Sequence, residues 1–572
     1  MVGNIAISSK TQSRSITRSH QLKRAGTDGS AEISNAGPSF RPQFPAGVMA
    51  GDAEHDRVVL WTKYTDPSKD TGQKKRFKVK ITNLFTNETI FINLTKQLRS
   101  SSGFAHVDVD SPFLKPYTQY EYQFEYSNGQ ATAYSPSGKF WTAILPGTSP
   151  PVEVEFGGVS CTHQSNGSRR GARGRQKRTD ENLKAASKRK LAFFVHAGDQ
   201  VYCDSEAGGG PAINIAGYER KYQQAFSKKR GLNKLHHSFG MYTTWDDHEI
   251  FNEWQGRDTD NKKAKEHLGI RKGNKIKAIK IAGKQSFFNH QPIRKNRSAS
   301  GHSTPLLGGH IPDCPYKPAT SMPTSARSRD DQRLWSSFRW GNTLELFILD
   351  CRSERARNKH KYISKEQLNW LIHALHNSQA TFKFILNSTP IGLFHRGKTG
   401  GRINNSNRWV ASAFSVQRKK ILSAAQCVGG VCWLSGDLHF GYCGGVTLDS
   451  SDFPGVCEVL MGPGGARKKQ RISKRVKRIK IDINNIDKTK KKDDPNWLKP
   501  FVTDTNNYVI IKAIPNTNPP MIDIKFLAQR KNIRRGRLTT YEHVIHHAKF
   551  ELRNRKWKLK HDINGIESAE SP

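Results

Sequence analysis

The chain has 572 residues, of which 35% are apolar, so it can bury a large core and is expected to form two domains or more. Its formal net charge of +44 predicts polyanionic surroundings or an anionic substrate, with solubility or lineage composition as the alternative explanation. No apolar run approaches the ~20 residues that span a bilayer, and the eight cysteines form no CxxC pair, which argues against a transmembrane protein, a zinc ribbon and a dense disulfide framework.

The first part of the chain changes character near residue 46. Residues 1–45 are rich in Ser, Arg and Lys and have no apolar segment of the kind that a secretory signal needs, so we predict a disordered basic arm and, by default, a cytoplasmic protein. From 46 to 145, short β-rich runs alternate with Asp, Asn, Gly or Pro. This pattern predicts a small all-β sandwich of the Ig or fibronectin type.

Residues 152–530 have an α/β pattern. Strand-like runs begin near residues 152, 191, 241, 344, 382 and 431, and helical patterns lie between them. The clearest helix is predicted to start at Ser364, with Gln367 completing a capping box. Three basic insertions, 168–190, 262–284 and 467–492, interrupt this layered α/β domain, and each favours a solvated loop or helix face over a nucleic-acid reader. Residues 531–572 form a basic C-terminal extension.

Three of the predicted strands end in acidic or imidazole side chains. The first ends at Asp199, the second at Asp247 and His248, and the third at Asp437 and His439. Sites in α/β sheets lie at strand ends, and carboxylates with imidazoles are ligands for hard or borderline metal ions. The pattern therefore suggests a polynuclear metal centre, although a helix N-terminus rich in acids and a polar loop remain alternatives for the second and third segments.

Further candidate ligands lie close to these ends. Tyr202 follows the first strand end by three residues, and a phenolate ligand suits a strong Lewis acid such as Fe(III). Cys161, after another predicted strand, could supply a thiolate, while Asn252 offers a neutral oxygen of the kind that calcium accepts. Arg352 could clamp a phosphoryl oxygen. Taken singly, the Tyr and the Cys are more often packing residues, and an Arg at that position could instead pair with Asp350.

In their order along the chain, these motifs resemble the PhoD-like alkaline phosphatase/phosphodiesterase family of the calcineurin-like metallophosphoesterases. The likeness runs from about Gly47 to Leu527. The matching segments are Gly47–Asp52, Val58–Thr62, Leu114–Tyr120, Ser160-Cys161, Gly198–Tyr202, Trp245–Asn252, Phe288–Arg294, Arg333–Arg339, Leu344–Arg355, Glu366–Leu371, Asn387 and Gly436–His439. One Gly-Asp-x-x-Tyr would be a weak indication, but the ordered set is specific.

The resemblance implies a four-layer α/β/β/α metallophosphoesterase domain after the β-sandwich, with a centre of Fe(III) and Ca²⁺ or other divalent metals. The implied metal ligands are Cys161, Asp199, Tyr202, Asp247, Asn252, Asp437 and His439. The first three would hold the iron, with Asp199 bridging the two ions. His248 would donate a proton or stabilise charge beside the phosphate, and Arg352 would orient the phosphoryl group.

The implied reaction is phosphoester hydrolysis, in which metal-bound hydroxide attacks a phosphomonoester or a phosphodiester. Three features depart from the family pattern, one of them being Cys351 and Glu354, which replace the Thr and the aromatic residue expected around Arg352. The family's Asp-x-Trp-x-Gly-Tyr stretch is reduced here to Asn407-Arg-Trp409, without the Gly and the Tyr, and the export signal common in the family is not seen.

A second hypothesis is a protein that binds nucleic acid or anionic lipid and has a structural or inactive metal site. The joint presence of Cys, Asp, Tyr, Asp-Asp-His and Asp-x-His favours the enzyme, because an inactive site would be expected to lack some ligands. The expected partners are a phosphate ester and, through the basic stretches, a polyanion. The expected oligomeric state is a monomer.

Overall fold

The strands of this chain assemble into two large sheets, a five-stranded sheet and a two-stranded ribbon. The computed structural model describes residues 43–66, 75–96, 103–163, 179–256, 268–270, 273–294, 333–356, 359–392, 395–396, 401–402, 408–409, 411–448, 451–465, 501–503, 505–534 and 537–566. The predicted insertion 467–492 and residues 1–42 of the predicted arm lie outside this set, as do parts of the other two basic insertions.

The larger sheet has ten strands in the order β24-β23-β22-β21-β9-β10-β11-β1-β2-β5. Its centre is parallel and consists of β9 (Val154–Val159), β10 (Phe193–Ala197) and β11 (Gly240–Thr244). β10 and β11 are buried along their whole length, as expected for parallel strands covered on both faces. One face is covered by α2 (Ile215–Ala225), α3 (Gly231–Ser238) and α5 (Gly273–His290).

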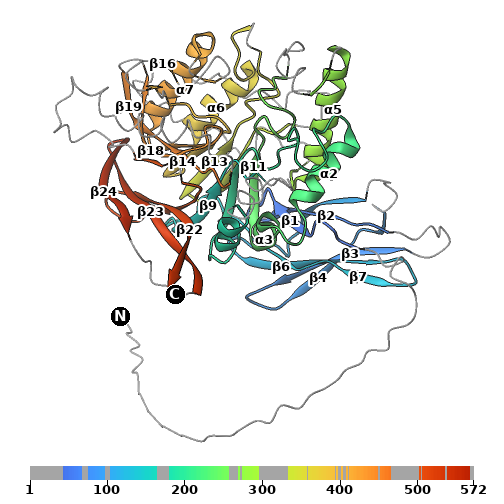
Figure 1. Cartoon of the computed structure of the whole chain (residues 1–572). Helices are drawn as coiled ribbons and strands as arrows, with labels where there is room; N and C mark the ends of the chain where they lie inside the picture. The colour runs from blue at the N-terminus through green and yellow to red at the C-terminus, as the bar shows by residue number, and fades with distance from the viewer. Residues whose placement is uncertain are drawn as a thin grey trace, which may run out of the picture. The chain divides into compact units, whose positions relative to one another are not determined.

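The second sheet has seven strands in the order β12-β13-β14-β17-β19-β18-β20. Its strands are β12 (Ser336–Trp340), β13 (Leu344–Ile348), β14 (Phe382–Leu386), β17 (Val431–Ser435), β18 (Gly441–Leu448), β19 (Ser451–Leu460) and β20 (Phe501–Thr503). The α-helices on it are α6 (Lys365–Asn377) and α7 (Ser415–Val428), preceded by the 3₁₀ turn η3 (Ser412–Phe414). Figure 1 shows α6 and α7, in yellow and orange, apart from α2 and α5, in green.

The two sheets share one apolar core, to which both contribute inward-facing side chains. Phe156 of β9 meets Phe384 of β14 edge to face, with 5.1 Å between ring centroids. The strands expected near residues 191, 241, 344, 382 and 431 are confirmed. So is the start of α6, where the Ser364 side chain accepts the Gln367 backbone N–H. The ribbon of β15 (His395–Arg396) and β16 (Gly401–Arg402) lies outside both sheets.

The N-terminal β-module is joined to the larger sheet. β1 (Val48–Gly51) pairs in parallel with β11, and β2 (Arg57–Lys63) and β5 (Phe104–Asp110) follow it to the sheet edge. Its other strands form the five-stranded sheet, namely β3 (Arg76–Asn83), β4 (Thr89–Asn93), β6 (Gln119–Ser127), β7 (Thr132–Tyr134) and β8 (Gly138–Trp141). Both sets contribute to one core, so the module packs against an edge of the larger sheet that it helps to build.

The C-terminal residues form the opposite edge of the ten-stranded sheet. β21 (Tyr508–Ile514) pairs with β9, and β22 (Met521–Arg534), β23 (Arg537–Arg553) and β24 (Lys556–Ile566) follow. β22 crosses the predicted boundary at residue 530. Trp557 of β24 is 1% exposed and donates its indole N–H to the Val431 carbonyl at 2.9 Å, which ties this edge to the second sheet.

Part of the second basic insertion is helical, since α5 starts at Gly273 and buries Ile276 and Ile279 against the larger sheet. None of the described helices combines the length and the apolar character needed to cross a membrane.

Three buried histidines, one in β10 of the larger sheet and two in the helices that cover it, should make the free energy of unfolding depend on pH. Burial lowers the pKa of His196 and of His290 to about 3, and that of His236 well below its usual value. Because the unfolded chain takes up protons below about pH 6.5 and these folded rings do not, His196 and His290 should each cost up to about 2 kcal/mol of stability at pH 5 relative to pH 7.

Urea unfolding of His290→Gln at the two pH values checks this, with the exposed His360→Gln as the control. The stability lost between pH 7 and pH 5 should be smaller in His290→Gln than in the wild type. The same loss in both proteins would contradict the assignment.

Candidate metal centre

Four strands place their following residues at one place between the sheets. Cys161 and Asp199 lie two residues beyond β9 and β10, Asp246 lies two beyond β11, and Asp437 lies two beyond β17 of the second sheet. Since β9, β10 and β11 are neighbouring parallel strands, their carboxyl ends share one edge. Glu249 joins two of these ends, because its carboxylate accepts the backbone N–H of Gln200 at 2.6 Å and of Asp246 at 2.9 Å.

The backbone at this edge takes up conformations that L residues rarely adopt. Cys161, Asp199, Asp437 and His439 have positive φ angles of 53°, 56°, 64° and 55°. Such strained residues cluster at functional sites, where the surrounding structure holds them in place. The turns aim the side chains at one another instead of continuing the strands.

Two groups of side chains could each hold an ion. The thiol of Cys161, the carboxylate of Asp199 and the imidazole of His439 offer atoms within 4.8 Å of one another, and so do Asp199, Asp247 and His248. Asp199 belongs to both groups. The Tyr202 hydroxyl donates to Asp199 Oδ2 at 3.1 Å and lies 3.1 Å from His439 Nε2, so it borders the first group.

The charges of this cluster are poorly compensated by the protein. Burial, together with the neighbouring carboxylates, raises the pKa of Asp199 well above its usual range, while burial raises that of Asp246 to about 6. Burial and the charge of Asp199 also raise the pKa values of Cys161 and Tyr202. Oδ2 of Asp246 is buried and has no hydrogen-bond partner among the described residues. A cation would relieve this cost, so the donor set fits a metal site.

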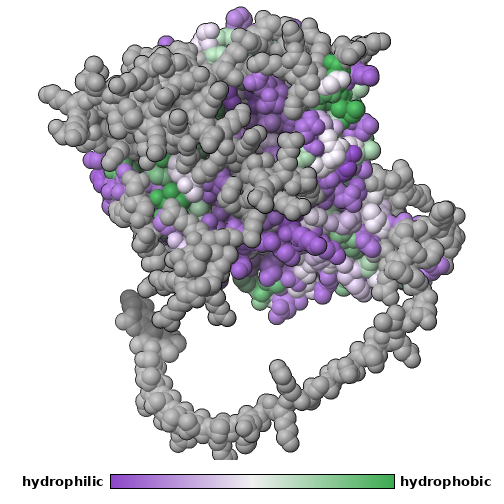
Figure 2. Space-filling view, in the orientation of Figure 1, coloured by the Kyte–Doolittle hydropathy of each residue, from purple (hydrophilic) through white to green (hydrophobic). Residues whose placement is uncertain are grey.

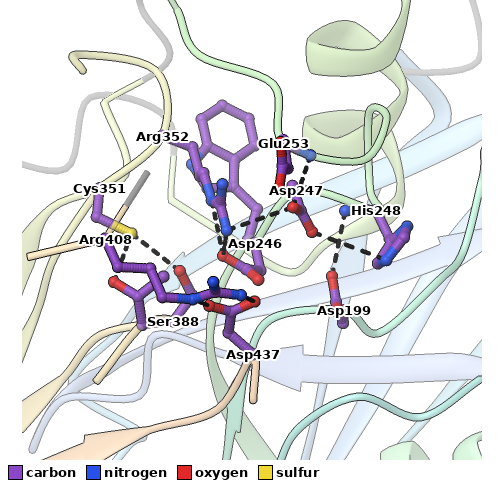
Figure 3. Close-up of polar contacts among 12 residues, drawn as sticks. Asp199, Asp246, Asp247, His248, Glu253, Cys351, Arg352, Ser388, Arg408 and Asp437 are labelled. Carbon is purple, nitrogen blue, oxygen red and sulfur yellow. Dashed lines mark hydrogen bonds and ion pairs between the residues drawn. The ribbon is translucent and has the colours of Figure 1, made fainter. Parts of the chain in front are cut away.

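The Arg352 guanidinium is bound by the acids that follow β11 (Figure 3). Its Nε donates to Asp246 Oδ1 at 2.7 Å, and its Nη2 lies 2.6 Å from the same oxygen and 3.5 Å from Asp247 Oδ2. The side chain is 2% exposed. Asp350, the alternative partner, accepts instead from the Trp245 indole at 2.8 Å and from the Arg352 backbone N–H at 3.1 Å. Arg352 therefore neutralises part of the acidic cluster.

Asp437 has a partner that the sequence did not indicate. Arg408 binds it with both arms of its fork, Nε to Oδ2 and Nη2 to Oδ1, the second at 2.8 Å. Burial opposes ionisation of Asp437, but Arg408 outweighs it and lowers the pKa of the carboxyl to about 2. Among the described residues, Asp437 is in neither of the two candidate ligand groups.

A second missed residue is Asp204, which holds His248. Its two oxygens lie 2.8 and 2.9 Å from His248 Nδ1, and Oδ2 also accepts the backbone N–H of Asn252 at 2.8 Å. Burial disfavours the imidazolium, but Asp204, Asp199 and Asp247 together raise the pKa of His248 well above its usual value. The only indication in the sequence is a second Asp after Gly-Asp-x-x-Tyr.

The structure therefore brings most of the predicted site residues together. Cys161, Asp199, Tyr202, Asp247, His248 and His439 lie in or beside the two candidate ligand groups. The Tyr202 and His248 rings stack with centroids 4.2 Å apart. Arg352 and Asp437 lie beside the centre in ion pairs, and Asn252 is exposed next to Asp204.

Comparisons with known proteins cover most of the chain. Residues 156–515 match the family model of PhoD-like phosphatase, and residues 30–144 match that of the PhoD-like phosphatase N-terminal domain. Alkaline phosphatase D of Bacillus subtilis (strain 168) is 23% identical in a comparison 465 residues long that covers 75% of this chain and 70% of the relative. A solved structure described as "Structure of PhoD" has a TM-score of 0.66 and 18% identity and covers 91% of this chain and 93% of its own, which shows a shared fold.

Asp199 is the one carboxylate common to both ligand groups, so its removal should affect both. Loss of a residue that only hydrogen-bonds to a metal ligand lowers metal affinity about 10- to 100-fold. Asp199→Asn removes a proposed ligand itself, so the affinity for metal should fall by more than this. Metal content after dialysis, measured by mass spectrometry, checks this, with the exposed Asp110→Asn as a control of equal charge change. Metal content like that of the wild type in Asp199→Asn would rule out Asp199 as a shared ligand.

Proposed function

The chain belongs to the PhoD-like phosphatase family and is a phosphoric ester hydrolase, and from this premise we propose that it cleaves its substrates at the centre around Asp199. The resemblance inferred from the ordered motifs is thereby confirmed. The observation that carries the proposal is the membership of Asp199 in both candidate ligand groups, because a shared carboxylate can bridge two cations.

We propose Fe(III) and Ca²⁺ as the two ions, with other divalent metals as the alternative for the second. The support for iron is the combination of a thiol, a phenol and a carboxylate around one position, from Cys161, Tyr202 and Asp199. A strong Lewis acid is required to deprotonate such donors when burial has raised their pKa values. Asp247 and Asn252, with Asp437 and His439, are the proposed remaining ligands.

The contacts of His248 suit its proposed role, whereas those of Arg352 restrict its proposed role of orienting the phosphoryl group. A bound metal ion would supply Lewis-acid activation of water and of the phosphoryl oxygens. His248 has Nδ1 held by Asp204 and Nε2 3.9 Å from Asp247 Oδ1, and these acids favour the protonated ring from which a proton can pass to the leaving group. Arg352 is almost fully buried between Asp246 and Asp247, so its contacts favour positioning of these acids over free rotation toward a substrate.

The overall architecture and domain limits are proposals of the same kind. We propose a four-layer α/β/β/α catalytic domain over 152–530, because helices cover the outer faces of two sheets that share a core. The β-module of 46–145 is proposed to be an Ig-like sandwich. Its first layer is the five-stranded sheet, and its second layer consists of β1, β2 and β5 at the edge of the ten-stranded sheet.

The proposed substrates are phosphomonoesters or phosphodiesters, and the charge of +44 supports large polyanions such as nucleic acid or anionic lipid. On the face shown in Figure 2, the described surface is mostly hydrophilic. Of the exposed large apolar side chains among the described residues, Phe85 and Tyr117 both contact Trp141 in the β-module. The proposed oligomeric state is a monomer.

Replacing Asp204 should lower kcat and leave KM near its wild-type value. In Asp204→Asn, kcat for p-nitrophenyl phosphate should fall by about 10- to 100-fold, because His248 loses the charge that orients it and stabilises its protonated form. KM should stay near the wild-type value, and metal content is measured alongside because Asp204 also accepts the Asn252 backbone N–H. Steady-state kinetics with Asp110→Asn as the control check this, and an unchanged kcat would show that Asp204 does not act through His248.

If the basic surface recruits polyanions, salt should act differently on large and small substrates. Raising salt from 50 to 200 mM should lower kcat/KM for a long anionic diester by about 10³-fold or more if six phosphates are contacted, whereas bis(p-nitrophenyl) phosphate should change little. Hydrolysis rates at both salt concentrations test this. Equal salt dependence for the two substrates would exclude the polyanion partner.

A further inference from the structure

A cleft lies between the β-module and the larger sheet, away from the metal centre. Its volume is about 660 Å³, within the range of ~300–1,000 Å³ that is typical of small-molecule sites. One wall comes from β6 and β8 of the module, and the other comes from β9, β21 and the end of α3. Glu155, near the start of β9, lines the cleft, whereas Cys161 of the metal centre follows the other end of this strand. At ~3.3 Å per residue, the extended chain between them is about 20 Å long, so the cleft is a separate site.

The module wall of the cleft presents an indole ring beside polar side chains. Gln119 of β6 lies opposite Trp141 of β8, and Glu121 lies opposite Lys139. Because side chains alternate along a strand, these four share one face of the sheet, while Tyr120 points into the core of the module. Trp141 also packs against the core between the two large sheets, which holds its ring in place. The wall is therefore a firm surface on which hydrogen-bonding groups stand next to an aromatic ring.

Two exposed aromatic rings adjoin this indole. The ring centroids of Tyr117 and Phe85 lie 5.3 and 5.7 Å from that of Trp141, and the two residues are 38% and 62% exposed. Tyr117 lines the cleft and has a φ angle of 49°, which glycine adopts easily and bulky L residues rarely adopt. Its backbone N–H donates to the Ala143 carbonyl at 3.0 Å, which holds this conformation. A strained backbone and an exposed ring both cost free energy, so Tyr117 points to a ligand that covers the ring.

The charged groups that line the cleft are of both signs. Among the described lining residues, three carboxylates accompany four cations, of which Lys512 is paired with Glu153 at 2.5 Å. Burial raises the pKa of Glu155 although neighbouring cations oppose the shift, so this carboxylate would gain from a hydrogen-bond donor. A cationic ligand would meet Lys139 and Lys190, and an anionic ligand would meet Glu155 and its neighbouring acids. A neutral ligand with many hydroxyl groups can donate to the carboxylates and accept from the lysines at the same time.

We propose that this cleft binds a short neutral carbohydrate, with the face of a sugar ring packed on Trp141 and Tyr117. One face of a pyranose ring consists of C–H groups that pack on an aromatic ring, and its edge carries hydroxyl groups. These hydroxyl groups donate to the carboxylates of Glu121 and Glu155 and accept from the Lys139 ammonium. Because the cleft is separate from the metal centre, the bound sugar attaches the enzyme to its surroundings independently of phosphoester hydrolysis.

The test measures binding of maltotetraose, cellotetraose and N-acetylchitotetraose to the full chain, as isolated with its metals, by titration calorimetry. Trp141→Ala removes the indole, and Tyr117→Gly removes the second ring while relieving the positive φ angle. Tyr134→Ala is the control, because Tyr134 is a 62% exposed ring on β7 outside the lining of the cleft. At least one sugar should bind the wild type with a Kd of about 1 mM or tighter, and the affinity should fall about 10-fold or more in each cleft variant. Tyr134→Ala should match the wild type.

Hydrolysis of p-nitrophenyl phosphate should be equal in all four proteins, because the cleft and the metal centre lie at opposite ends of β9. If Trp141→Ala fails to fold, Tyr117→Gly still decides the question, since glycine tolerates that backbone. Failure of all three sugars to bind the wild type would overturn the inference, as would an equal loss of affinity in Tyr134→Ala. Binding of choline in place of the sugars, lost in the cleft variants, would overturn it in favour of an organic cation. A wild-type dimer in sedimentation that becomes monomeric in the cleft variants would identify a self-association surface instead.

Discussion

The burial of several carboxylates at one sheet edge is the constraint on which the rest of this structure depends. Asp199, Asp246 and Asp247 are each at most 5% exposed, and burial raises the pKa values of Asp199 and Asp246. Two arginines from distant segments offset part of this cost by forming ion pairs. Arg352 pairs with Asp246, and Arg408 pairs with Asp437. Among the described residues, Asp199 accepts hydrogen bonds from the His248 backbone N–H and the Tyr202 hydroxyl, and its cationic neighbour is the His248 imidazole. Metal ions at this position would neutralise the charge that these contacts leave.

The fold holds this edge through its sheet pairings. β9, β10 and β11 carry the ligand turns, and they are flanked by β1 of the N-terminal module on one side and β21 of the C-terminal part on the other. Loops alone could not fix the turns as firmly, because each turn residue at positive φ is strained and must be held from both sides. The N-terminal module is therefore part of the scaffold of the centre: Arg294 donates its backbone N–H to Asp52 at 2.8 Å, and Trp61 donates to the Asn289 carbonyl at 2.7 Å, which ties the module to α5.

The two arginines beside the centre differ in their surroundings. Arg352 is enclosed, and its guanidinium is paired with Asp246 and Asp247. Arg408 is more exposed and is supported by the aromatic stack of Trp409 and Tyr362. The local sequence does not distinguish the two: Arg352 follows a strand, and Arg408 precedes a Trp. Their difference follows from the depth at which the second sheet and its loops place them.

By itself the sequence determined the family, the α/β class and most of the side chains that the structure gathers as candidate ligands. The order of Cys161, Gly198–Tyr202, Trp245–His248 and Gly436–His439 was enough for this, because each motif follows a buried strand and strand ends meet in α/β folds. Only the tertiary structure decided which acids are paired and which are shared. Asp204, Asp246 and Arg408 have no spacing that marks them, since their partners lie 44, 106 and 29 residues away, at His248, Arg352 and Asp437. Likewise, the pairing of β1 with β11 joins residues about 190 positions apart, a contact that hydrophobic periodicity cannot specify because it reports local structure and not strand partners.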